Sequence, residues 1–435
     1  MRFLSTRGAA PAADLVQVLQ AGLAPDGGLY LAEHIPVLEP DAFAGAHTPA
    51  QVGARLLAPY FAGSALESGL SMLCDEAFAQ SIPLHALRGA GDHVLELFHG
   101  PSAAFKDIGA RFLAAALARL RMPDDPLRTI LVATSGDTGG AVAAAFHRRA
   151  GFRVLILYPQ EGVAPRQARQ LGAFGDNVQA YRVDGTFDDC QRMAKRALGD
   201  AALRAALPLA SANSISLGRL LPQAGYYAWA ALQYWRQHAR ALSFIVPTGN
   251  LGNALACVIA RRMGLPIGRI VLACNANDTL PRYFAGEPYA AQPSRRTLAN
   301  AMDVGAPSNF ERLRALYADD AALRADLTAH AVSDADIRAT LRTAHARHGL
   351  LPCPHTATAL HVLQRLRAAG DTQPFAIVAT AHAAKFAEVV EPEFGHAAAI
   401  PKPLAALLAR PSHSETLTAG DDALLARLRQ LHHIG

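Results

Sequence analysis

Lys106 stands where an apolar strand pattern gives way to a helical one, within residues 98–107. A lysine at the start of a helix meets the positive end of the helix dipole, which disfavours a cation. Its sequence neighbours Phe105, Ile108 and Phe112 are apolar, and an apolar environment also disfavours the ammonium form. Both effects lower the expected pKa of the amine, which suits a Schiff-base lysine or a general base. Without this context, a lysine is more often an amphipathic surface residue.

Two further loops lead from a strand pattern into a helix pattern and carry groups that bind anions. Residues 133–140 read Ala-Thr-Ser-Gly-Asp-Thr-Gly-Gly, and residues 246–253 read Val-Pro-Thr-Gly-Asn-Leu-Gly-Asn. Free backbone N–H groups at a helix start bind carboxylates and phosphates, so the second loop has the form of a phosphate cradle. It is neither a Walker loop nor a dinucleotide-binding fingerprint. The first loop lacks the G-x-S-x-G spacing of a nucleophile elbow, and a plain helix cap explains it equally well.

A fourth loop, residues 379–386, supplies Thr380, His382 and Lys385. His382 alone is more often a core or surface histidine than a catalyst. Taken together, the four loops meet the needs of pyridoxal phosphate, which requires a lysine, a phosphate cradle and a partner for its pyridine nitrogen. A threonine hydroxyl in the last role supplies no charge, so the ring would stay largely neutral. We expect no metal site, because H-E-x-x-H is absent and the Cys-Pro-His run at 353–355 has no companions at ligand spacing.

The elements that must position these loops alternate between short aliphatic runs and longer helical patterns from about residue 94 onward. This alternation predicts parallel sheet covered by helices, a fold in which ligands bind beyond the carboxyl ends of the strands. The predicted strands are 94–98, 129–133, 153–157, 178–183, 244–246, 270–273 and 375–379. The predicted helices are 103–120, 140–149, 187–198, 217–238, 253–262 and 356–367.

Composition narrows the class of protein. The 435 residues are 51% hydrophobic and 18% charged, which excludes a disordered chain. The net charge is +5, but the arginines are scattered without a basic arm, so we expect no nucleic-acid partner.

Only four of the 41 basic residues are lysines. Two of them, Lys195 and Lys402, lie outside the four loops, and we expect either to tolerate replacement by arginine.

The five cysteines are dispersed and odd in number, which argues against a disulfide framework and fits a reducing, cytoplasmic location. The N-terminus has no apolar signal core. The uncharged stretch 241–260 carries Pro-Thr-Gly-Asn at its centre, so we interpret it as strand, turn and helix and expect no membrane span. We expect a mostly helical N-terminal unit at 1–90, a large α/β domain at 91–105 and 225–392, a smaller α/β domain at 106–224, and a C-terminal helical appendage at 393–435.

The ordered motifs resemble the threonine synthase family, most closely its bacterial and fungal branch. The matching segments are 98–107, 133–139, 211–214, 247–252 and 380–382, together with 27–30 and 275–282. The resemblance covers most of the chain and implies the fold type II architecture of pyridoxal-phosphate enzymes, as in the tryptophan synthase β subunit. That architecture has two parallel-sheet domains with helices on both faces. The implied reaction converts O-phospho-L-homoserine and water to L-threonine and phosphate.

The resemblance also implies roles for individual residues. Lys106 would be the Schiff-base lysine, Thr380 would face the pyridine nitrogen, and the cofactor phosphate would be bound by Gly249, Asn250, Leu251, Gly252 and Asn253. We further expect substrate contacts from Ser135, Asp137 and Thr138, and contacts to the substrate phosphate from Arg111, Arg219 or Lys385, for which surface ion pairs are an equally good explanation. The sequence departs from the family pattern at Ser102, Leu251 and Ala383, where Thr, Phe and Pro are expected.

Several alternatives stay open. A fold type II dehydratase or β-replacement synthase shares the lysine and the glycine loop. A related phospho-lyase would release a keto acid in place of threonine. A non-catalytic cofactor-binding or anion-binding regulatory protein would keep the binding loops without turnover. The assembly is expected to be a monomer or a homodimer with a small-molecule substrate.

Overall fold

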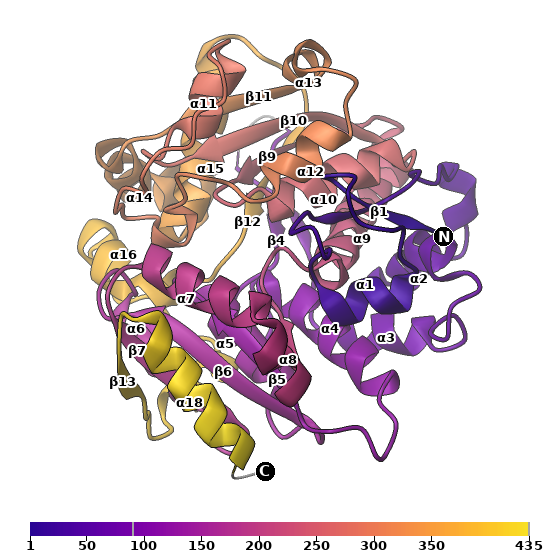
Figure 1. Cartoon of the computed structure of the whole chain (residues 1–435). Coiled ribbons are helices and arrows are strands. Elements are labelled where there is room, and N and C mark those ends of the chain that lie inside the picture. The colour runs from indigo at the N-terminus through magenta and orange to yellow at the C-terminus, as the bar shows by residue number, and fades with distance from the viewer. Residues whose placement is uncertain (89–90, 434–435) are drawn as a thin grey trace.

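Two sheets form the framework of the protein in a computed structural model that describes residues 1–88 and 91–433 (Figure 1). The larger sheet has the order β11 (Leu327–Ala331), β10 (Ile267–Cys274), β9 (Leu242–Pro247), β12 (Phe375–Ala379), β4 (His93–Glu96) and β3 (Leu84–Ala86). Its neighbouring strands are parallel except β3, which pairs antiparallel with β4. The smaller sheet has the order β13 (Glu415–Thr418), β7 (Val178–Asp184), β6 (Phe152–Pro159), β5 (Arg128–Ala133) and β8 (Leu209–Ser211), all parallel.

Helices cover both faces of each sheet, as the sequence predicted. Alternate residues of β5 show this directly, because Ile130 and Val132 pack with one helical layer and Leu131 and Ala133 with the other. The longer helices of the main layers are α4 (Lys106–Arg119), α5 (Asp137–Phe146), α7 (Phe187–Gly199), α9 (Leu217–His238), α10 (Gly252–Arg262), α14 (Asp334–His348), α15 (Pro354–Ala368) and α18 (Asp421–His433). Shorter helices are α6 (Pro165–Leu171), α8 (Ala201–Ala206), α11 (Thr279–Phe284), α12 (Phe310–Ala315), α13 (Asp320–Asp326), α16 (Ala387–Phe394) and α17 (Lys402–Leu408), with 3-10 turns η2 (Asn300–Met302) and η3 (Ala383–Phe386).

Helix α4 joins the two halves of the molecule. Its residues Ile108 and Phe112 belong to the core of the larger sheet, whereas Ala110 and Leu113 belong to the core of the smaller one. The first residue of α4 is Lys106, so this lysine is fixed at the junction of both sheets. The predicted helix 103–120 was therefore placed correctly, although it begins three residues later than expected.

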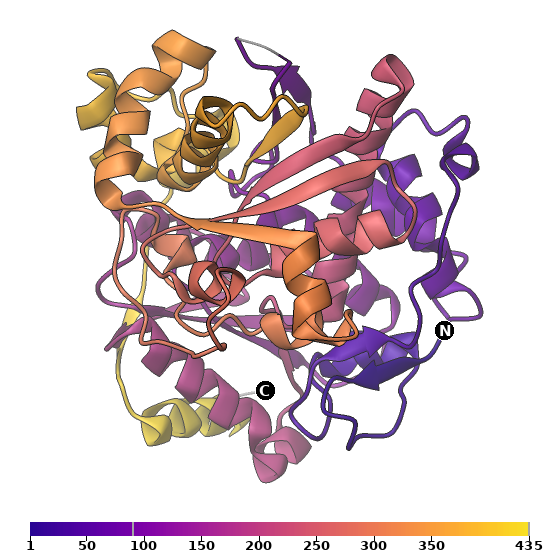
Figure 2. The same cartoon turned by 90° about the horizontal axis from the view of Figure 1, so that it is seen from above.

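The N-terminal segment contains a small two-stranded sheet as well as the expected helices. Strands β1 (Phe3–Ser5) and β2 (Tyr30–Ala32) pair antiparallel beside α1 (Leu15–Ala21), η1 (Pro40–Phe43), α2 (Pro49–Phe61) and α3 (Leu70–Ala77). Figure 1 and Figure 2 both show this indigo and violet segment along one side of the molecule. No helix within residues 1–88 and 91–433 is long and apolar enough to cross a membrane.

The C-terminal segment, expected to be a helical appendage, also extends the smaller sheet. Strand β13 pairs with β7, and Leu424, Leu425 and Leu428 of α18 are buried against the same core as α7. In both views the yellow α18 lies beside α7 (Figure 2). The sequence did not reveal β13 because only one of its four residues is even partly buried, so it lacks the apolar alternation of a covered strand.

Candidate active site

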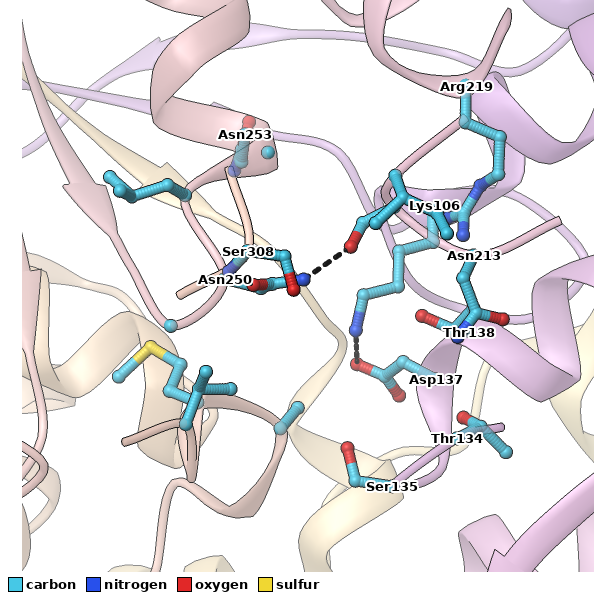
Figure 3. A pocket seen from close by; sticks show the side chains of 18 of the residues that line it. Lys106, Thr134, Ser135, Asp137, Thr138, Asn213, Arg219, Asn250, Asn253 and Ser308 are labelled. Carbon is cyan, nitrogen blue, oxygen red and sulfur yellow. Dashed lines mark hydrogen bonds and ion pairs between the residues drawn. The ribbon is translucent and has the colours of Figure 1, made fainter. Parts of the chain in front are cut away.

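The four loops singled out by the sequence meet at one pocket beyond the carboxyl ends of the strands (Figure 3). Lys106 enters it from the start of α4, residues 133–138 from the end of β5, residues 247–254 from the end of β9, and Thr380 from the end of β12. The pocket therefore lies between the two sheets, with loops from each sheet forming its walls. His382 is not among the lining residues; its ring Nδ1 accepts a hydrogen bond from the backbone N–H of Ala384.

Lys106 has the lowered basicity that its sequence context predicted. Its side chain is 15% exposed, and its Nζ lies 3.8 Å from a carboxylate oxygen of Asp137. Burial lowers the pKa of Lys106 to about 8, although the Asp137 charge acts in the opposite direction. Arg219 and Lys385 lower this pKa further because they are also cationic. Much more of Lys106 than of an ordinary lysine is therefore free amine near neutral pH, as a nucleophile or base requires.

Asp137 is the first residue of α5 and is buried at the bottom of the site. Its Oδ1 accepts hydrogen bonds from Lys385 Nζ and Gln167 Nε2, both at 2.7 Å. Burial alone would raise the pKa of Asp137, but the charges of Lys385 and Lys106 lower it well below the usual range. The carboxylate is therefore ionised, and its Oδ2 faces Lys106 (Figure 3).

Residues 249–252 form a cradle that fits a phosphate group. None of their backbone N–H groups donates a hydrogen bond within the described chain. A side chain at Gly249 would collide with the backbone of Met302, since its Cβ would lie 2.7 Å from that Cα. Leu251 adopts a φ of 62°, which turns the chain into α10 at Gly252. The result is a row of free donors at the start of an eleven-residue helix, which is the geometry that binds phosphate.

Asn253 directly follows this cradle and lines the same pocket. Its Oδ1 accepts hydrogen bonds from the hydroxyls of Tyr226 and Tyr227, whereas its buried Nδ2 has no partner in the described chain. An unpartnered buried donor costs free energy unless a ligand satisfies it. Asn250 is fixed by Ser214 and by the backbone N–H of Ser308. The residues expected to hold the cofactor phosphate thus fit an anion that the chain itself does not supply.

The loop after β5 faces this cradle across the pocket. Thr134 Oγ1 accepts hydrogen bonds from the backbone N–H groups of Gly136 and Gly139, both at 2.9 Å, which sets the turn into α5. Asp137 and Thr138 are the first two residues of that helix, so their N–H groups have no intrahelical acceptors. Ser135 and Thr138 line the pocket, and their hydroxyl groups are further donors in the same loop.

The three cationic candidates for the substrate phosphate occupy different places. Arg219 lines the pocket; its Nη1 donates to the Ala212 carbonyl at 2.7 Å, while its buried Nε has no partner in the described chain. Burial lowers the pKa of Arg219 to about 10. Arg111 and Lys385 are not among the lining residues. Arg111 donates to Gln80, and Lys385 is fully buried against Asp137.

The sequence did not reveal several other lining residues. His355, at the start of α15, is buried at the pocket, and burial lowers its pKa to about 4, so its ring is neutral. Lys195 of α7 lines the pocket although it lies outside the four loops. Asn213 and Ser214 also line the pocket. They lie in the segment 211–214, which resembles the family but had no role assigned from the sequence. The only sequence signal for His355 is the Cys-Pro-His run at 353–355, whose spacing lacks the companions of a metal site and does not indicate this pocket.

Comparison with known proteins agrees with this geometry. Residues 84–382 match the family model for pyridoxal-phosphate-dependent enzymes, residues 2–78 the threonine synthase N terminus, and residues 356–428 the threonine synthase C-terminal region. The threonine synthase of Haemophilus influenzae is 38% identical over 388 residues, covering 89% of this chain and 90% of that protein. The crystal structure of threonine synthase from Escherichia coli superposes with a TM-score of 0.91 at 34% identity, covering 99% of this chain and all of that one.

A structure of threonine synthase from Brucella melitensis with bound pyridoxal phosphate superposes with a TM-score of 0.89 at 34% identity, covering 99% of both chains. The matches extend over both sheets and both terminal segments, and the C-terminal match includes strand β13, which pairs with β7. The expected fold type II architecture is thereby confirmed. The chain belongs to the threonine synthase family of pyridoxal-phosphate-dependent enzymes.

Proposed function

We propose that this chain is a threonine synthase that converts O-phospho-L-homoserine and water to L-threonine and phosphate. One observation carries the proposal. The Lys106 amine, whose pKa burial lowers to about 8, shares a pocket with a free phosphate cradle and with the buried guanidinium of Arg219. A phosphorylated amino-acid substrate and a phosphorylated cofactor each need such an anion site.

The residues that would hold pyridoxal phosphate are Lys106, the loop from Gly249 to Asn253, and Thr380. When bound, the cofactor supplies an aldehyde that condenses with amines and a ring that withdraws electrons from the carbons attached there. The Thr380 hydroxyl is a neutral partner for the pyridine nitrogen, in contrast to a carboxylate. Free amides in the cradle and the unpartnered Nδ2 of Asn253 provide the donors for the phosphate.

Side chains of the protein then account for the proton transfers and for binding of the substrate. Lys106 Nζ takes the proton from the α-carbon of the substrate, releases it, and as a free amine again takes a proton from the β-carbon, as a base of lowered pKa can. The ammonium ion formed in this second transfer can return its proton to the γ-carbon after the phosphate has left. Ser135, Thr138 and the first N–H groups of α5 hold the amino-acid carboxylate or the phosphate. Arg219 stabilises the phosphate dianion as it leaves the γ-carbon, because charge-assisted hydrogen bonds are strongest where water is excluded. Water adds at the β-carbon after the γ-carbon is reprotonated.

The experiment is an assay of the purified protein with O-phospho-L-homoserine that measures threonine, phosphate and 2-oxobutyrate together. Equal amounts of threonine and phosphate support the proposal. Phosphate with 2-oxobutyrate would indicate the phospho-lyase, and 2-oxobutyrate formed from threonine would indicate a dehydratase. A visible cofactor band without any product would indicate a binding protein.

Two coarser inferences accompany this function. All five cysteines are free and buried, which suits a reducing cytoplasm. The pocket is built from one chain, so a monomer and a homodimer are both compatible with activity, and light scattering of the purified protein distinguishes them.

A further inference from the structure

Lys385 is a cation with almost no access to solvent or to the pocket. It lies in η3, which follows β12 of the larger sheet, and its side chain is 1% exposed. Its Nζ lies 2.7 Å from Asp137 Oδ1 and donates to the carbonyl of Ser102, also at 2.7 Å. Two of its three donors are therefore engaged by the protein, which leaves little for a substrate phosphate.

The ion pair of Lys385 with Asp137 connects the two halves of the molecule. Asp137 starts α5 after β5 of the smaller sheet, whereas Lys385 follows β12 of the larger one. Gln167 of α6 donates to the same Oδ1 at 2.7 Å, so this oxygen is held by two donors. Its partner Oδ2 is the one directed at Lys106 Nζ, 3.8 Å away. The orientation of the carboxylate is thus set from the side opposite the reactive lysine.

The charges around Lys106 determine how this arrangement affects the protonation of its amine. The titratable groups that face it are Asp137 from α5, Arg219 from α9, Lys385 from η3 and His355 from α15, which is neutral. A lone Asp137 would form a buried pair with Lys106 and hold it as an ammonium ion. Lys385 already balances the carboxylate, so the second lysine is not required to stay protonated.

We propose that Lys385 is a positioning residue: it fixes Asp137 across the junction of the sheets, so that this carboxylate orients the Lys106 amine without retaining its proton. Lys385 is then not a ligand of the substrate phosphate, which removes it from the three candidates named by the sequence. The assignment rests on the proposed function only for its catalytic meaning, because the amine of Lys106 can be measured without substrate.

The test measures the reactivity of each lysine in the full-length chain from which the cofactor has been removed, with its folding checked by circular dichroism. Only four lysines are present, so competitive labelling with an amine reagent followed by mass spectrometry resolves them all. We expect Lys106 to label with a midpoint near pH 8, as its lowered pKa requires, and Lys385 to stay unlabelled until the chain unfolds. In Lys385→Met, the Lys106 midpoint should rise by about one pH unit or more. Lys402→Met is the matched control and should leave it unchanged.

A folded Lys385→Met variant with an unchanged Lys106 midpoint would overturn the proposal, since a merely structural lysine would have no effect on that titration. If that variant does not fold, the labelling of the native chain tests the proposal. Labelling of Lys385 as readily as the exposed Lys402 would contradict the buried pair with Asp137. The same labelling with pyridoxal phosphate bound separates the two proposals. Lys106 that stays reactive in the loaded protein refutes the cofactor assignment and leaves the role of Lys385 standing.

Discussion

The backbone carbonyl oxygen of Arg219 would lie 2.5 Å from a Cβ atom at Gly109, so α4 and α9 touch through their backbones at this glycine. Gly109 lies one turn after Lys106, and the side chain of Arg219 enters the same pocket. The close approach of the two helices therefore sets the separation between the reactive amine and the guanidinium proposed for the substrate phosphate.

We expect Gly109→Ala to lower the free energy of unfolding by about 1–3 kcal/mol, because a backbone atom cannot move aside as a flexible side chain can. Chemical denaturation measures the effect. Gly199→Ala is the control, since a Cβ at Gly199 meets nothing within 4 Å, and it should leave stability unchanged or raise it by up to about 1 kcal/mol. Equal stability of Gly109→Ala and the native chain would show that the helices separate at little cost.

Lys106→Ala should lose the visible absorbance band of the bound cofactor after gel filtration. Threonine production should fall by a factor of about 10² to 10⁴ or more, since the base is removed with the point of attachment. Reduction of the native protein with borohydride should fix the cofactor on the peptide that contains residue 106. Lys402→Ala, changed at an exposed residue of α17, should retain both the band and the activity. A band that survives in Lys106→Ala would rule out this lysine.

Arg219→Gln should reduce kcat/KM for O-phospho-L-homoserine by about two orders of magnitude, because loss of a buried charge-assisted contact costs about 2–5 kcal/mol. Inhibition by inorganic phosphate should weaken in parallel. Arg111→Gln should have a smaller effect, since Arg111 donates to Gln80 and does not line the pocket. Thermal melting shows whether either variant is folded. The reverse order of effects would assign the phosphate to Arg111.

The sequence was sufficient to predict the loops of this site because of a general property of parallel sheets. Strands β4, β9 and β12 were all located, with β12 at its observed bounds, and as parallel strands of the larger sheet they must end at one edge of it. A lysine, a glycine cradle and a threonine placed after such strands are therefore brought together whatever the details of packing. The same reasoning interpreted the loop 246–253 as a phosphate cradle without knowledge of its partners.

Other features depend on contacts between distant segments and could not be read from local patterns. Lys385 and Asp137 are 248 positions apart, and nothing in either loop indicates that their side chains meet. The short edge strands β3 and β13 have few buried residues and gave no alternating signal. The amphipathic pattern of α7 predicted a helix but not that its residues Gln191 and Lys195 would line the pocket, which depends on how the helix docks.

Lys195 is exposed, and it lies at the pocket without an ion-pair partner among the described residues. We expect Lys195→Gln to raise KM for the phosphorylated substrate by about three- to tenfold, with a smaller change in kcat and a weaker dependence on salt. Lys195→Arg should be tolerated, because it keeps the charge. Arg196→Gln is the matched control, as Arg196 on the same helix is paired with Asp421. Equal KM values for both glutamine variants would remove Lys195 from substrate capture.

The rate at which added pyridoxal phosphate restores the visible band to the stripped chain should depend on the protonation of Lys106. Only the free amine is a nucleophile, so the rate should increase about tenfold per pH unit below the pKa and level off above it. Burial lowers this pKa from 10.5 to about 8, which places the plateau just above pH 8. The reaction of the cofactor with Nα-acetyl-lysine, whose ε-amine is free, should keep accelerating to higher pH. Dividing by the rate of this reaction corrects for ionisation of the cofactor itself.

The two residues that flank the amine should move this profile in opposite directions. Asp137 raises the pKa of Lys106, so Asp137→Asn should shift the plateau to lower pH, whereas Lys385 lowers it, so Lys385→Met should shift the plateau to higher pH. A general loss of structure would slow loading at every pH without this opposite pair of shifts. Movement of both variants in the same direction would therefore contradict the view that Asp137 is shared between the two lysines.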